Sequence, residues 1–134
     1  MSYILDTDIC VYWLKGDEKI ESKALDVGLD SLSISFITLS ELYFGAHKSQ
    51  KVKHNLLNVE KLRKKLIVIE SSDTVCKTFG KIKVPLVKEG KIIDDADIFI
   101  AACALSEGVI LVTNNEGHFK RIKGLKLENW LSVK

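Results

Sequence analysis

Short apolar runs and longer segments of helical periodicity alternate along this chain of 134 residues. The runs have the length and composition of buried strands, at 3–5, 32–35, 66–69, 109–112 and, last, 125–127. Between them, apolar residues recur every three or four positions, which predicts helices over 9–14, 18–27, 36–47, 52–65, 73–90 and 95–106. This alternation predicts an α/β fold of three layers, in which helices cover both faces of a central parallel sheet.

Length and composition are those of an ordinary globular protein. Hydrophobic residues make up 46% of the chain and charged residues 28%, which excludes disordered and collagen-like classes. A single proline and no low-complexity tract give no sign of a linker, so one domain is expected over 1–134. No apolar run approaches the roughly 20 residues that cross a bilayer, and Asp6 comes too early for a secretory signal. A cytoplasmic location is therefore expected.

The cysteines and histidines give no pattern of a metal or disulfide site. The three cysteines are far apart in largely apolar surroundings and are predicted to be reduced packing residues: Cys10, Cys76 and Cys103. The histidines do not have the spacing of a ligand set and are assigned surface or core roles: His47, His54 and His118. Neither a disulfide framework nor a zinc ribbon is supported.

Charge is unevenly distributed although the net charge is only +2. Residues 1–30 contain seven acidic and three basic side chains, a net charge of −4. Residues 45–65 contain seven lysines and arginines against one glutamate, a net charge of +6. A basic segment beside acidic sites suits a polyanion such as a nucleic acid. The simpler alternative is a solvated helix face.

Polar side chains follow two of the predicted strands. Asp6 comes directly after the first strand, and Thr113 and Asn114 come directly after the strand over 109–112. Functional groups of parallel sheets gather at these carboxyl ends. Asp6 would serve equally well as the N-cap of the next helix, and so would Asp8.

Two further acids stand on predicted helices. Glu41 shares one surface line with Thr38, Gly45 and Lys48, whose small members suit a close approach by another group. Its alternative role is a partly exposed glutamate near Lys48. Asp97 falls in a first helical turn, where the helix dipole stabilises an acid by roughly 0.3–1 kcal/mol. Three acids within residues 94–97 nevertheless exceed what a helix cap needs.

These carboxylates would converge if their strands are neighbours. Ionised carboxylates in a small volume raise one another's pKa and need a cation. Hard divalent cations prefer oxygen ligands, and Mg²⁺ typically keeps several waters and takes only a few carboxylates. Asp6, Glu41 and Asp97 are therefore the candidate metal-binding and catalytic residues.

Three stretches together resemble one known family. "ILDTDICVYWLKG", "SISFITLSELYFGAHKS" and "DADIFIAACALSEGVILVTNN", the last followed by "HF", are similar in order and spacing to the PIN-domain ribonucleases, in particular the VapC-type toxins of toxin–antitoxin modules. The resemblance extends over essentially the whole chain, down to the closing "GLKLENWL".

The resemblance implies an RNA-cleaving enzyme that uses Mg²⁺, with Mn²⁺ as a substitute. It also implies tRNA as a frequent substrate, a VapB-like antitoxin that blocks the active site, and a homodimer. By the same resemblance, Asp6, Glu41 and Asp97 match the acidic positions of the metal site, and Thr113 matches a site hydroxyl. A fourth acid commonly follows that threonine, whereas this chain has Asn114 and Asn115.

Two other functions remain open at this point. "YILDTD" also resembles the D-x-D of haloacid-dehalogenase-like phosphatases, in which the first aspartate is a nucleophile. That interpretation leaves "TLSEL" unexplained, and Asp8→Asn separates it from the nuclease. The other is a non-catalytic interaction protein of the same fold, which the absent fourth acid alone favours.

Overall fold

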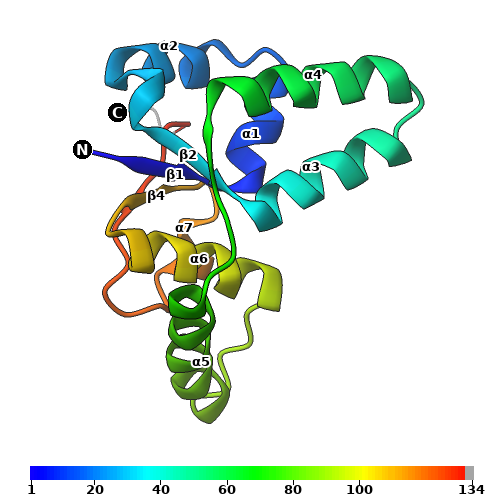
Figure 1. Ribbon diagram of the computed structural model, residues 1–134. Coiled ribbons are helices and arrows are strands. Elements are labelled where there is room, and N and C mark those ends of the chain that lie inside the picture. Colours follow the sequence, from blue (N-terminus) through cyan, green and yellow to red (C-terminus); the bar gives the residue numbers. More distant parts are fainter. Residues whose placement is uncertain (132–134) are drawn as a thin grey trace.

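The computed structural model describes residues 1–131 and confirms an α/β fold around an all-parallel, five-stranded sheet (Figure 1). The strands are β1 (Tyr3–Leu5), β2 (Leu32–Ser35), β3 (Ile67–Ile69), β4 (Ile110–Val112) and β5 (Leu127–Glu128). Their order is β3-β2-β1-β4-β5, so β1 lies at the centre. The chain winds from β1 to one side and later returns to the other, which makes the boundary between β1 and β4 a topological switch point.

Helices form a layer on each side of the sheet (Figure 1). One layer holds α1 (Thr7–Leu14), α2 (Glu18–Val27), α3 (Phe36–Lys48) and α4 (Val52–Lys65), with a short 3₁₀ turn at Leu29–Ser31. The other holds α5 (Asp73–Lys88), α6 (Asp95–Glu107) and α7 (Glu116–Phe119). Figure 1 shows α3 and α4 as a hairpin that projects from the sheet. None of the helices within 1–131 has the length and apolarity needed to span a bilayer.

The three inner strands, β1, β2 and β4, are buried on both faces, as their continuous apolar runs predicted, whereas the edge strands β3 and β5 are only partly buried. Tyr3 and Leu5 pack into the core beneath α1–α4, whereas Ile4 between them packs into the core beneath α5–α7. In β4, Leu111 likewise faces the second core while both of its neighbours face the first. Successive residues of one strand therefore pack into opposite cores, so each inner strand contributes side chains to both.

Several boundaries, most by one or two residues, and two short elements differ from the sequence prediction. The first helix begins at Thr7, because Asp6 caps it two residues earlier than expected. The last strand is Leu127–Glu128 and not 125–127, because its register is fixed by the pairing of Leu127 with Leu111 in β4. The 3₁₀ turn and the short α7 were not predicted, since four or fewer residues show no periodicity.

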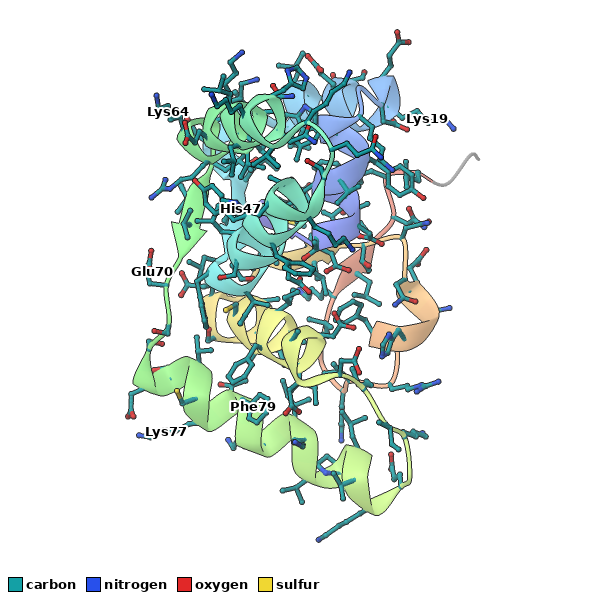
Figure 2. All side chains as sticks on the ribbon, turned by 90° about the vertical axis from the view of Figure 1, so that its right-hand side faces the viewer. Lys19, His47, Lys64, Glu70, Lys77 and Phe79 are labelled. Atoms are coloured by element: carbon teal, nitrogen blue, oxygen red, sulfur yellow. The ribbon has the colours of Figure 1, made fainter. Side chains whose placement is uncertain are left out.

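The cysteine prediction is wrong at one position. Cys10 and Cys103 are buried, but Cys76 is exposed. The buried stripe of α5 runs through Val75 and Ile82, and the residue after Val75 points about 100° away from it. The partly buried Phe79 lies between α5 and α6, as Figure 2 shows, with its ring stacked 4.2 Å from that of Phe99.

Candidate active site

Asp6 ends the central strand and lies between the ends of β2 and β4. The residue is 5% exposed. Its Oδ1 accepts a hydrogen bond from the backbone N–H of Thr7 (2.8 Å), and its Oδ2 accepts one from the hydroxyl of Thr113 (2.7 Å) at the end of β4. Asp6 therefore lies at the switch point of the sheet, where open α/β folds bind their ligands.

Asp8 belongs to the same edge, from the first turn of α1. Its Oδ2 accepts a hydrogen bond from the backbone N–H of Asn114 (3.1 Å), in the loop after β4. Its Oδ1 is buried and has no hydrogen-bond partner among the residues that the structure describes. A buried carboxylate oxygen without a partner is costly, so this atom is suited to accept from water or a ligand.

Asp97 approaches from the opposite helical layer, in the first turn of α6. Asp94 occupies the N-cap position of α6, but its side chain makes no capping hydrogen bond. The Asp97 side chain is 24% exposed, and its Oδ2 lies 3.6 Å from Nδ1 of His118 in α7. Asp97 thus faces into the molecule beside the end of β4 instead of serving the helix cap.

Glu41 is held at the site by a chain of hydroxyl groups. Thr7 Oγ1 donates to Glu41 Oε1 (2.5 Å) and lies 3.1 Å from Thr38 Oγ1, which in turn lies 3.3 Å from Ser35 Oγ. Because a hydroxyl has one hydrogen, Thr7 accepts from Thr38 when it donates to the carboxylate. Residues from β2, α1 and α3 together orient the exposed Glu41. Lys48, the expected neighbour of Glu41, lies over Phe44, with its Nζ 5.3 Å from the ring centre.

Burial raises the pKa of three of these carboxyl groups, and neighbouring acids add to the rise for Asp6 and Asp97. Burial raises the pKa of Asp6 to about 7, and the charges of Asp8 and Asp97 add to the rise against the hydrogen bonds from Thr113 and Thr7. Burial also raises the pKa of Asp8 and that of Asp97. Nearby Glu41 adds to the rise for Asp97, whereas His118 opposes it. Within 1–131, no lysine or arginine forms an ion pair with these four acids.

The donor set fits a hard divalent cation. All four acids offer oxygen, one of these oxygens is buried without a partner, and their mutual repulsion would be relieved by positive charge. Within 1–131, no group of three or more His, Cys, Asp or Glu side chains has the geometry to hold a metal ion, so at most two of these side chains could bind one directly as they stand. This open arrangement suits Mg²⁺, which is usually bound by one or two carboxylates and keeps several waters.

Sequence reasoning found part of this site. Asp6, Asp97 and Thr113 come together as expected, and Glu41 reaches them through Thr7. Asp8 was considered only as a cap or as a phosphatase residue, although its two-residue spacing from Asp6 in "DTD" was a usable signal. His118 was assigned only a surface or core role, and the structure places its ring, on the short α7, 3.6 Å from Asp97 Oδ2.

Comparisons with known proteins identify the family of this chain. The family model described as PIN domain matches residues 3–125. Ribonuclease VapC2 of Haemophilus influenzae is 37% identical over 131 residues, which cover 98% of this chain and 99% of the relative. This protein belongs to the PIN domain family, in its VapC branch. The tRNA(fMet)-specific endonuclease VapC of Shigella flexneri is 32% identical over 130 residues, with 97% and 98% coverage.

Solved structures of similar proteins have the same fold as this chain. VapBC2 from Rickettsia felis, bound to a DNA fragment from its promoter, superposes with a TM-score of 0.91 at 36% identity. The superposition covers 97% of this chain and 99% of that one. Because the relatives that match over nearly the full chain are named as ribonucleases or endonucleases, membership favours the nuclease over the phosphatase interpretation.

Proposed function

We propose that this PIN-domain protein is a Mg²⁺-dependent endoribonuclease and the toxin of a VapBC-type toxin–antitoxin module. The observation that carries the proposal is the buried Asp6, whose pKa is raised to about 7 beside Asp8 and Asp97. Such an arrangement costs stability that a purely structural role does not require. Full-length similarity to VapC ribonucleases supports the same activity.

In this proposal Asp6 and Asp97 hold Mg²⁺ directly, and Glu41 holds it directly or through water. Mn²⁺ is a plausible substitute. Such an ion lowers the pKa of water and offsets the negative charge that develops on a phosphate group under attack. The protein's own contribution is orientation: Thr113 fixes Oδ2 of Asp6, and Thr7 fixes Oε1 of Glu41.

RNA is the proposed substrate, with tRNA as the narrower hypothesis. The relative from Shigella flexneri is named for tRNA(fMet), which supports that hypothesis. Exposed Phe44 and Lys48 on α3 offer a stacking ring and a cation within four residues of each other. The basic side chains of α4, such as Lys64 (Figure 2), would add contacts to the RNA backbone that weaken with salt.

A VapB-like antitoxin is the proposed protein partner. The similar structure from Rickettsia felis is that of a VapBC pair, which supports this partner by similarity. An open pocket of about 250 Å³ between α1, α3 and α4 is lined by apolar residues such as Val11 and Leu42, with Glu41 at the site. An antitoxin segment in this pocket would lie beside the carboxylates. A homodimer remains a prediction, which sedimentation of the isolated protein tests.

The test incubates the protein, freed of any bound partner, with total cellular RNA and maps the cut ends by sequencing. Discrete cuts in Mg²⁺ that vanish with EDTA and in Asp97→Asn are expected. Asp95→Asn is the matched control, since Asp95 lies in the same helical turn but is exposed and pairs with Lys83 at 2.8 Å. Full cleavage by Asp97→Asn would overturn the site, and no cleavage by the intact protein would favour the non-catalytic alternative.

A further inference from the structure

His118 brings a nitrogen atom to a site otherwise made of oxygen atoms. Phe119, which is fully buried, fixes α7 in the core beneath α5–α7, and the preceding residue is thereby turned toward α6. His118 Nδ1 lies 3.6 Å from Asp97 Oδ2, and the two side chains are 23% and 24% exposed. The ring is thus half-buried beside a carboxylate of the proposed metal site.

The distance between these two atoms suits two ligands of one ion. A separation of 3.6 Å is longer than a good hydrogen bond, which is about 2.7–3.2 Å, so the two groups do not satisfy each other. Two ligands bound at about 2.0–2.2 Å lie about 2.8–3.6 Å apart, from octahedral to tetrahedral angles. An ion could therefore bind both atoms with little movement of either side chain.

Asn115 holds the imidazole in this orientation. Its Nδ2 lies 2.8 Å from His118 Nδ1, and its backbone N–H donates to Thr113 Oγ1 at 2.9 Å. The same turn therefore connects the ring to the threonine that holds Asp6. An ion on Nδ1 would replace the amide contact, and because Asn115 is exposed, its amide can turn to water instead.

We propose that His118 supplies a nitrogen ligand beside Asp97, and that the site consequently holds Mn²⁺ and Co²⁺ more tightly than Mg²⁺. The inference rests on the metal site of the proposed function. Carboxylate and water suit Mg²⁺, whereas imidazole favours transition ions, whose affinity for such ligands rises from Mn²⁺ to Co²⁺. The identity of residue 118 would then decide which ions the site selects.

Electron spin-echo modulation of bound Mn²⁺ tests the ligand without measuring activity. Strong coupling to a directly bound ¹⁴N is expected in the intact protein and in His54→Gln, and its loss is expected in His118→Gln. His54 is the matched control because it is exposed on α4, where its ring contacts Asn58. Circular dichroism of both variants checks folding, and absence of nitrogen coupling in the intact protein would overturn the proposal even if His118→Gln fails to fold.

Equilibrium titrations give the second measurement. We expect His118→Gln to lower Co²⁺ affinity by about 10- to 100-fold and Mg²⁺ affinity by less than about threefold. Bound Mn²⁺ without nitrogen coupling, or coupling that persists in His118→Gln, would overturn the role of His118 and leave the metal site standing. Absence of Mn²⁺ and Mg²⁺ binding by the intact protein would instead overturn the metal site of the proposed function as well.

Discussion

Asp95 and Asp97 are two residues apart in the first turn of α6 and lie in opposite surroundings. The side chain of Asp95 is 59% exposed and pairs with Lys83 at 2.8 Å. The side chain of Asp97 is 24% exposed, and burial, Glu41, Asp94 and Asp8 together raise its pKa. One helical turn thus carries an ordinary surface carboxylate and a carboxylate kept among other acids. Their sequence context is nearly the same, so the difference in exposure and pKa comes from the side chains that surround each of them in the fold.

Exposed and buried acids also differ in what they contribute to the stability of the fold. Exposed ion pairs, such as Asp73 with Lys77 at 3.1 Å, contribute at most about 1 kcal/mol. Buried acids without a cation cost stability and persist where function requires them. We therefore expect substitutions in the two groups to affect activity and stability in opposite ways.

The largest effect is expected for Asp6→Asn. Loss of this carboxylate should lower the rate of RNA cleavage by more than about 100-fold, because a direct ligand matters more than an outer-shell group. The amide is nearly the same size as the acid, so the fold should persist. Initial rates on a mapped RNA substrate, with circular dichroism as the folding control, measure this effect. Cleavage within tenfold of the intact protein would remove Asp6 from the site.

Stability should depend on pH through the same residue. Asp6 has a pKa of about 7 in the folded protein against 3.8 as a free side chain, so the folded state binds more protons between these values. The contribution of Asp6 to the free energy of unfolding is therefore fully present below about pH 4 and is lost as the pH rises to about 7. Asp8 and Asp97 act in the same direction.

Urea unfolding in EDTA at pH 5 and pH 8 measures this dependence. The free energy of unfolding of Asp6→Asn, relative to the intact protein, should increase from pH 5 to pH 8 by an amount on the order of a few kcal/mol. If this difference in unfolding free energy stays constant or decreases from pH 5 to pH 8, the charged form of Asp6 does not destabilise the folded protein. Divalent metal at pH 8 should restore stability to the intact protein alone.

A smaller effect is expected for Thr7→Val, which breaks the hydroxyl chain to Glu41. Cleavage should fall by about 10- to 100-fold, because Glu41 loses the group that orients it. Stability should fall by only about 1 kcal/mol. Ser40→Ala is the control, since Ser40 precedes Glu41 in the chain but donates its side-chain hydrogen bond to the carbonyl of Phe36 at 2.8 Å. Equal losses of cleavage in both variants would contradict an orienting role for Thr7.

The smallest effect is expected for Lys83→Ala, on the exposed side of the comparison. This change removes the pair with Asp95 and a contact with Phe79, whose ring centre lies 5.6 Å from Lys83 Nζ. Because the Lys83 and Asp95 side chains are 41% and 59% exposed, the free energy of unfolding should fall by less than about 1 kcal/mol. Thermal unfolding and cleavage rates measure the result. A large loss of cleavage would place the exposed acid within the site.

The sequence predicted the elements that depend on local pattern. The continuous apolar runs of the strands and the strand-end position of Asp6 were visible without coordinates. The last strand was misplaced because its register depends on Leu111, which is 16 positions away. The Cys76 error has a local cause: Cys76 directly follows the buried Val75, and the apolar spacing of α5 did not show which of the two faces the core.

The rest of the site depends on contacts between distant segments. Asp8 is held at the site by a hydrogen bond from the backbone N–H of Asn114, 106 positions later in the chain. Glu41 is linked to Thr7 across 34 positions, and His118 is turned toward Asp97 by a helix of only four residues. A pattern within one short segment contains none of these pairings, so a cap and a site carboxylate look alike until the fold is known.

The central claim is that the buried carboxylates form a site for a divalent cation. Anomalous diffraction from crystals grown with Mn²⁺ tests it most directly, because the ion is located without reference to activity. We expect a peak within about 2.0–2.3 Å of carboxylate oxygens of Asp6 and Asp97. Crystals that contain Mn²⁺ elsewhere but show no peak at these two residues would contradict the account.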